Sequence, residues 1–135
     1  MPGRNNIGLD TTVVLRLLTG EPASQFERAR KFIEEQLANN KKLFVSDLVI
    51  AESYFALHYH YQVPKAEALK QLENLLSSGI IHPAPESVCH KVLKNQAHHK
   101  AGLVDEIIHE QYCLFADQIV SFDKSMTRLQ RTVVL

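Results

Sequence analysis

The 135-residue sequence has few cysteines, no long apolar run and no excess of charge of either sign. Its two cysteines, Cys89 and Cys113, are not spaced as in a zinc knuckle, so we expect reduced packing residues inside helices. No run is long enough to span a membrane and the N-terminus lacks a signal-peptide-like stretch, so we expect a cytoplasmic protein. The 15 Lys and Arg balance the 15 Asp and Glu, and bulk charge therefore does not indicate nucleic-acid binding.

Short apolar runs alternate with amphipathic helical patterns along the whole chain. Strands are expected at residues 6–9, 43–45, 80–81, 118–122 and 132–135. Helices are expected at residues 11–17, 22–38, 47–59, 64–78, 86–97, 103–115 and 125–129. Apolar strands separated by helices indicate an α/β fold with a parallel sheet covered on both faces. The length and the absence of a repeat or linker predict one domain, residues 1–135.

Four acidic residues end or interrupt apolar runs: Asp10, Glu52, Asp105 and Asp123. Carboxylates in such runs are costly unless they are paired, hydrogen-bonded or bound to metal. Ligand sites in α/β sheets form beyond the carboxyl ends of the strands, where we expect all four to meet, with Glu52 partly buried. Crowded carboxylates raise one another's pKa, and a divalent cation such as Mg²⁺ relieves this repulsion.

The acidic residues lie in segments that resemble a known family. Segments 10–16, 49–52, 103–105 and 121–124 resemble, in that order, the four acidic motifs of PIN domains, the fold of VapC-type toxins. The resemblance covers nearly the whole chain. It implies a three-layer α/β/α sandwich and a metal-dependent endoribonuclease. The partners it implies are RNA, an antitoxin protein and a second copy of the chain.

The resemblance also assigns roles within the site. It gives the metal-binding role, for Mg²⁺ or Mn²⁺, to Asp10, Glu52, Asp105 and Asp123, and a supporting role to the Ser121 hydroxyl. The hydroxyls of Thr11 and Ser121 can hydrogen-bond acids or phosphate. Cations position a nucleic-acid backbone without reading its sequence, and three basic residues near the motifs are expected to do so: Arg16, Lys124 and Arg128.

Three residues depart from the family pattern. Thr12 stands where the family often has Asn, and Glu106 and His109 follow Asp105 where small residues are usual. Glu106 is expected to face solvent rather than to add a ligand, and His109 can line the site. Outside the motifs, Asp47 and Asp117 are expected to be turn or cap residues that stay out of the site.

Several alternatives remain open at this point. Each of the four acids can instead serve only as a helix cap, a turn residue or a surface residue. The chain can also be a PIN-like domain that binds RNA or protein without cutting. A phosphoacceptor receiver domain is disfavoured, because Asp10 has no acidic neighbour and no lysine follows the last strand. A zinc site is disfavoured too, because His58 and His60 cannot share a helix face and His98 and His99 lie in a polar connection. For a homodimer, the apolar stripe of residues 69–76 offers a surface.

Overall fold

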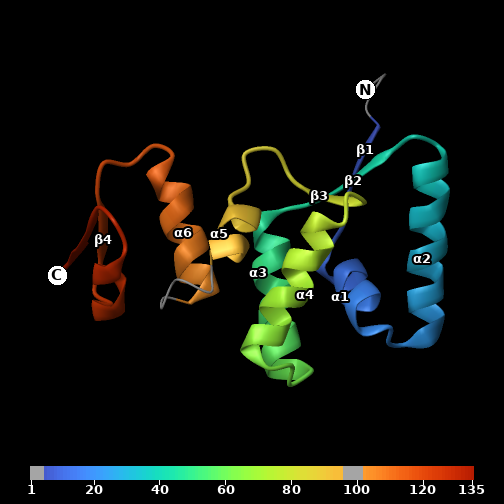
Figure 1. Cartoon of the computed structure of the whole chain (residues 1–135), viewed down its shortest axis with the longest axis horizontal. Coiled ribbons are helices and arrows are strands. Elements are labelled where there is room, and N and C mark those ends of the chain that lie inside the picture. Colours follow the sequence, from blue (N-terminus) through green and yellow to red (C-terminus); the bar gives the residue numbers. More distant parts are fainter. Residues whose placement is uncertain (1–4, 96–101) are drawn as a thin grey trace. The chain divides into compact units, whose positions relative to one another are not determined.

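A computed structural model describes residues 5–95 and 102–135 of the chain (Figure 1). The chain divides into two compact units, an N-terminal unit that runs to Pro85 and a C-terminal unit that begins at Glu86. Each unit is described by itself below. In the described parts of the chain, no helix combines the length and the apolar character that crossing a membrane requires.

The N-terminal unit is organised around three parallel strands. They are β1 (Asn6–Gly8), β2 (Lys42–Val45) and β3 (Ile81–Pro83), in the order β1-β2-β3. The register places Ile7 opposite Leu43, and Leu43 opposite Ile81. Leu43, Val45 and Ile81 are buried, so the central strand and its neighbour supply apolar core residues.

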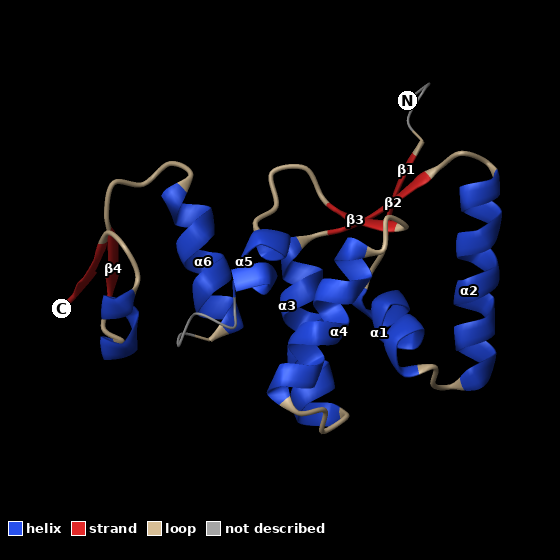
Figure 2. Ribbon diagram, viewed as in Figure 1, coloured by secondary structure: helices blue, strands red, loops and turns tan. Residues whose placement is uncertain are grey.

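Helices connect these strands, as Figure 2 shows. They are α1 (Thr11–Thr19), α2 (Ala23–Ala38), α3 (Asp47–Phe55), the π-helical turn η1 (Ala56–His60) and α4 (Lys65–Ser77). α1 packs against both α2 and α3, and α4 packs against α3, η1 and β3. Val14, Ile50 and Leu72, from three of these helices, are buried in the core that results.

Local sequence signals set the helix boundaries in this unit. Gly20 ends α1 in a left-handed conformation (φ 71°), which glycine adopts without steric cost. Ser46 caps α3, because its Oγ accepts a hydrogen bond from the backbone N–H of Val49 at 3.2 Å. Asn39 follows the last residue of α2 and Pro64 precedes the first residue of α4, as predicted.

The described residues of the C-terminal unit form two α-helices, a 3-10 helix and a pair of parallel strands. Its elements are α5 (Cys89–Asn95), α6 (Leu103–Cys113), β4 (Ile119–Ser121), the 3-10 helix η3 (Lys124–Arg128) and β5 (Thr132–Val134). β4 pairs with β5, with Ile119 opposite Thr132. α5 packs against α6, and Val92, Leu103 and Ile107 are buried.

All predicted strands and helices are present in the predicted order, and every strand pair is parallel, which confirms the α/β class. Most boundaries differ from the prediction by one or two residues, and the helix expected over residues 47–59 is α-helical only to Phe55. Two further differences concern the third strand and the helix after it. The third strand begins at Ile81 and continues to Pro83, and the helix expected from Glu86 begins at Cys89. Glu86 has a positive φ of 65°, which a helix does not accommodate. The expected end of that helix at Ala97, and the polar connection 98–100, lie outside the described residues.

The prediction that the apolar stripe of α4 offers a dimer surface is wrong. Ala68, Leu72 and Leu76 are buried, and they pack into the core of their own unit. Leu69 and Leu75 are only half-buried, but they flank the same inward face. The stripe has the helical period of a core-facing surface, and the period alone does not distinguish burial within a chain from burial between chains.

We expect Ser46→Ala to lower the free energy of unfolding by about 1 kcal/mol, because it leaves the Val49 N–H at the start of α3 without its side-chain acceptor. Urea denaturation of the wild type and the variant measures this difference. Ser46→Asn keeps an acceptor at the cap and is the control. If both variants unfold at the same urea concentration as the wild type, the cap does not stabilise α3.

Candidate active site

Asp10 lies just beyond the carboxyl end of β1 and caps α1. Its Oδ1 accepts a hydrogen bond from the backbone N–H of Thr11 at 2.8 Å, and its side chain is exposed. The cap uses one carboxylate oxygen, so the second oxygen, Oδ2, is not required for capping. Asp10 therefore serves as a helix cap and can still present an oxygen ligand at the edge of the sheet.

Glu52 lies in the second turn of α3, as predicted, and is joined to α1 through Thr11. The Thr11 hydroxyl lies 3.4 Å from Glu52 Oε2, to which it donates a long hydrogen bond. Because Thr11 directly follows Asp10 and α1 packs on α3, this contact brings the first two acidic motifs together within the N-terminal unit. The expected partial burial of Glu52 is wrong: Ile50 and Ala51 are buried, but the helix turns Glu52 to the exposed side.

Asp105 is the third residue of α6 and is half-buried. Its Oδ2 lies only 3.8 Å from the place that a Cβ would take on Gly102, so the side chain turns back toward the start of the helix. Gly102 provides no side-chain cap there. The positive end of the helix dipole favours a carboxylate at this position.

Asp123 follows β4 and caps η3. Its Oδ1 accepts hydrogen bonds from the Ser125 hydroxyl at 2.7 Å and from the Ser125 backbone N–H at 2.9 Å. These bonds lower the pKa of Asp123, first through the hydroxyl and then through the amide. Ser121 supports the same turn, because its Oγ accepts from the backbone N–H of Asp123 at 3.0 Å.

The structure thus links Glu52 to Thr11, the neighbour of Asp10, in the N-terminal unit and places Asp105 and Asp123 in the C-terminal unit. Across residues 5–95 and 102–135, no group of three or more His, Cys, Asp or Glu side chains is arranged to hold a metal ion. A shared site for the four carboxylates therefore stays a prediction.

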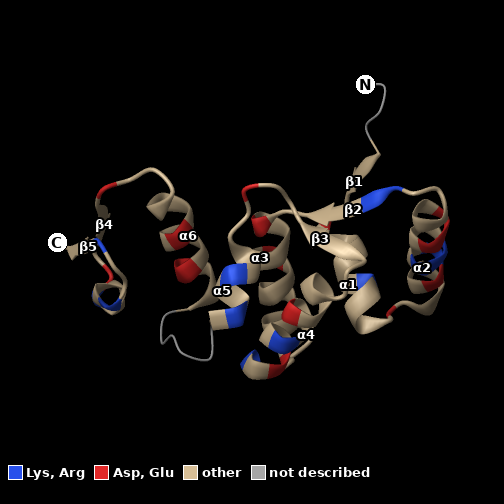
Figure 3. Ribbon diagram, turned by 45° about the horizontal axis from the view of Figure 1, so that its top comes forward, with Lys and Arg blue, Asp and Glu red and all other residues tan. Residues whose placement is uncertain are grey.

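The predicted phosphate-binding residues lie on two different helices. Arg16 donates from Nε to Gln25 Oε1 at 2.6 Å and so connects α1 to α2. It also borders an open apolar groove between β1, α1 and α2, which Phe32 lines from α2. Lys124 and Arg128 are exposed on η3, immediately after Asp123. Figure 3 shows basic residues in blue in this C-terminal part of the chain. Both basic side chains of η3 are thus available to solvent beside an acidic motif.

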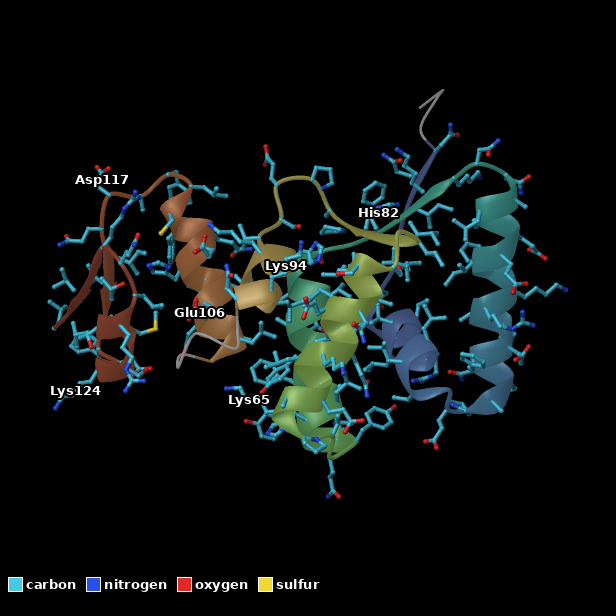
Figure 4. All side chains as sticks on the ribbon, viewed as in Figure 1. Lys65, His82, Lys94, Glu106, Asp117 and Lys124 are labelled. Atoms are coloured by element: carbon cyan, nitrogen blue, oxygen red, sulfur yellow. The ribbon has the colours of Figure 1, made fainter. Side chains whose placement is uncertain are left out.

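The prediction that Glu106 faces solvent is wrong. Glu106 is only 1% exposed and lies on α6 (Figure 4). It follows Leu103 by three residues and precedes Ile107, and both are buried, so it shares the inward face of the helix. The charge of Glu106 suggested a surface position, but its place in the helical period puts the side chain on the inward face of α6.

His109 continues this inward face of α6, and it is buried as well. Its Nε2 lies 2.6 Å from the backbone carbonyl oxygen of Gln130, and the Cys113 sulfur lies 3.7 and 3.8 Å from the two ring nitrogens. His109 therefore ties α6 to the segment before β5, which is a structural contact rather than one to an acidic motif.

Two further sequence assignments have different outcomes. Asp117 is exposed in the connection between α6 and β4, as expected (Figure 4). Asp47, expected to be a turn or cap residue, is buried and begins α3, where Ser46 provides the cap. The sequence prediction also missed the density of aromatic rings in the segment 54–61, although four of its eight residues are Tyr or Phe.

Comparison with known proteins agrees with this arrangement of motifs. The family model of the PIN domain matches residues 7–131. The chain belongs to the PIN domain family. A curated relative, the "VapC ribonuclease" of Aquifex aeolicus (strain VF5), is 32% identical over 74 residues. The match covers 55% of this chain and 54% of that protein, so the chain spans about half the length of the relative. The predicted membership of the PIN family, and the α/β fold it implied, are confirmed.

We expect Ser125→Ala to raise the pKa of Asp123 toward the ordinary value of about 3.9, because the stronger of its two hydrogen bonds is lost. In the wild type the lowered pKa stabilises the folded chain above the pH at which a free Asp ionises. That stabilisation is lost as the pH falls through the folded-state pKa. Carboxyl titration by NMR measures the change. Ser125→Thr, which keeps a hydroxyl, is the control, and an unchanged pKa in Ser125→Ala would contradict the assignment.

Proposed function

We propose that this PIN domain protein is a metal-dependent endoribonuclease. The observation that carries the proposal is the contact of Thr11 with Glu52 beside Asp10, because it joins two acidic motifs that are far apart in the sequence. Membership of the PIN family supports the same reading, and so does the name of the relative, "VapC ribonuclease".

The chemistry of the donor set fits Mg²⁺ or Mn²⁺. Asp10 and Glu52 are exposed and offer only oxygen ligands, which hard divalent cations prefer. We propose that Asp10, Glu52, Asp105 and Asp123 hold the ion, with both units acting as one PIN-like domain, residues 1–135. When bound, such an ion activates water and stabilises charge on the scissile phosphate.

The remaining residues of the motifs orient these ligands and the substrate. Thr11 restrains the Glu52 carboxylate, and Ser121 fixes the turn that presents Asp123. We propose that Lys124 and Arg128 contact phosphates, with Arg16 contributing from α1. No side-chain nucleophile is needed, because the attacking group is water.

The biological setting is proposed by analogy with the relative. If this chain is also a toxin ribonuclease, RNA is its substrate and an antitoxin protein its inhibitor, and we propose a cytoplasmic homodimer. A second candidate is a PIN-like domain that binds RNA or protein without cutting. The burial of Glu106 beside Asp105 favours it, because a second acid in the third motif alters the surroundings of a proposed ligand.

We expect Mn²⁺ to raise the melting temperature of the protein, because a ligand that binds only the folded state stabilises it by mass action. Differential scanning fluorimetry measures the shift. Asp10→Asn combined with Glu52→Gln should remove it, and Asp117→Asn, an exposed acid outside the motifs, should not. An unchanged melting temperature of the wild type at millimolar Mn²⁺ would contradict the proposed metal site.

We expect single-stranded RNA to be cleaved by the wild type with Mn²⁺ and not with EDTA. Asp10→Asn should lower the cleavage rate by orders of magnitude while keeping the α1 cap, since Asn caps helices as well as Asp does. Gel analysis of labelled RNA measures the rate, with Asp117→Asn as the matched control. RNA that binds but stays intact would support the non-cutting alternative.

A further inference from the structure

A row of exposed aromatic rings continues along α3 and η1 from Glu52. Phe55 follows Glu52 by three residues on α3, which places both on one face of that helix. Tyr59 lies in the π-helical turn that follows, and its ring stacks on that of Phe55. Phe55 is 44% exposed and Tyr59 is 69% exposed. The aromatic row therefore begins beside the Thr11–Glu52 contact and stays within the N-terminal unit.

Neighbouring rings hold the row in place. Phe55 and Tyr59 are stacked, with centroids 5.9 Å apart and planes at 27°. The ring of His58 meets Tyr59 edge-on at 4.7 Å, and His58 in turn stacks on the buried ring of Tyr54 at 5.8 Å. His58 is tied down further, because its Nδ1 lies 3.0 Å from the backbone carbonyl oxygen of Val63. The Tyr59 ring is thus exposed, but its contacts with Phe55 and His58 restrain it.

The backbone beneath these rings is unusual. Residues Ala56–His60 form a π-helical turn, a wide turn that is rare and is frequent at functional sites. Leu57, inside the same turn, is completely buried and anchors it to the core. The wide turn and its anchor give Tyr59 a fixed position although most of its ring is exposed.

We propose that Phe55 and Tyr59 form a stacking platform for the bases of single-stranded RNA next to the scissile phosphate. This inference rests on the proposed nuclease function. Aromatic rings bind bases through their π-faces, and each stacked base strengthens binding by roughly fivefold to a hundredfold. Every base has such a face, so the platform binds single-stranded RNA with little sequence preference. A duplex is not bound in this way, because its bases are already stacked on one another.

The surroundings of the row favour RNA over a second copy of this chain. The centre of a protein–protein interface is depleted of charged residues. Here the row begins at the exposed carboxylate of Glu52, and the exposed side chains of His60 and Lys65 follow it. A nucleic-acid strand accommodates this order, with bases on the rings, a phosphate near the Lys65 ammonium and the cleaved bond near the carboxylates.

The experiment measures binding of a short fluorescent oligoadenylate by anisotropy, in EDTA so that the RNA is not cut. We expect Tyr59→Leu and Phe55→Leu to weaken binding at least fivefold, and Tyr59→Trp to retain it. Phe32→Leu is the matched control, because Phe32 is a similarly exposed ring (43%) on α2 outside the row. An abasic oligonucleotide of equal length should bind the wild type and Tyr59→Leu alike, because it offers no base to stack.

The other outcomes contradict either the stacking platform or the nuclease function. Equal weakening with oligoadenylate and abasic RNA, or unchanged binding of Tyr59→Leu, overturns the platform. A lower molar mass of Tyr59→Leu in light scattering overturns it too, and assigns the row to contact between copies. If the wild type cleaves RNA with Mn²⁺ while Tyr59→Leu binds normally, the platform alone is wrong. If binding depends on Tyr59 but the wild type never cleaves, the nuclease function alone is wrong.

Discussion

The parallel pairing of β2 with both β1 and β3 is the constraint on which the N-terminal unit depends. β2 is the central strand, and its buried residues Leu43 and Val45 fix the register of both neighbours. Because parallel strands end at the same edge of a sheet, α1 and α3 both start there. A one-residue slip of β2 would turn Leu43 and Val45 to the opposite face and displace α3. The contact between Thr11 and Glu52 is therefore a consequence of strand pairing as much as of its own hydrogen bond.

Two of the acidic residues show how one carboxylate can combine a structural role with a proposed functional one. Asp10 caps α1, and Asp123 caps η3 with a lowered pKa. A cap keeps the carboxylate in a single orientation before any ligand arrives, which reduces the entropy lost on binding. The cap and the ligand roles were alternatives in the sequence, but the geometry at Asp10 allows both, because a carboxylate has two oxygens.

The sequence predicted the order of elements well, because each boundary has a local cause. Gly20, Ser46 and Pro64 mark helix ends through their own backbone or side-chain chemistry, and no distant contact is needed. Directions of side chains were predicted less well. Glu106 was expected in solvent and Glu52 partly inside, and both are reversed. The period of a helix fixes which residues share a face, but which face turns inward depends on the tertiary partners.

The π-helical turn at Ala56–His60 changes the phase of the helix that continues from α3. Such a turn holds one more residue than an α-helical turn, so it has the form of a single-residue insertion that the helix absorbs instead of a loop. The residues before the turn keep the same helix face against α1. After the turn, the faces of the helix are offset by one residue. A helix can in this way acquire a new surface beyond the turn while its earlier contacts stay unchanged. The segment that carries Tyr59 can therefore present a different face from that of α3 without changing the contacts that place Glu52.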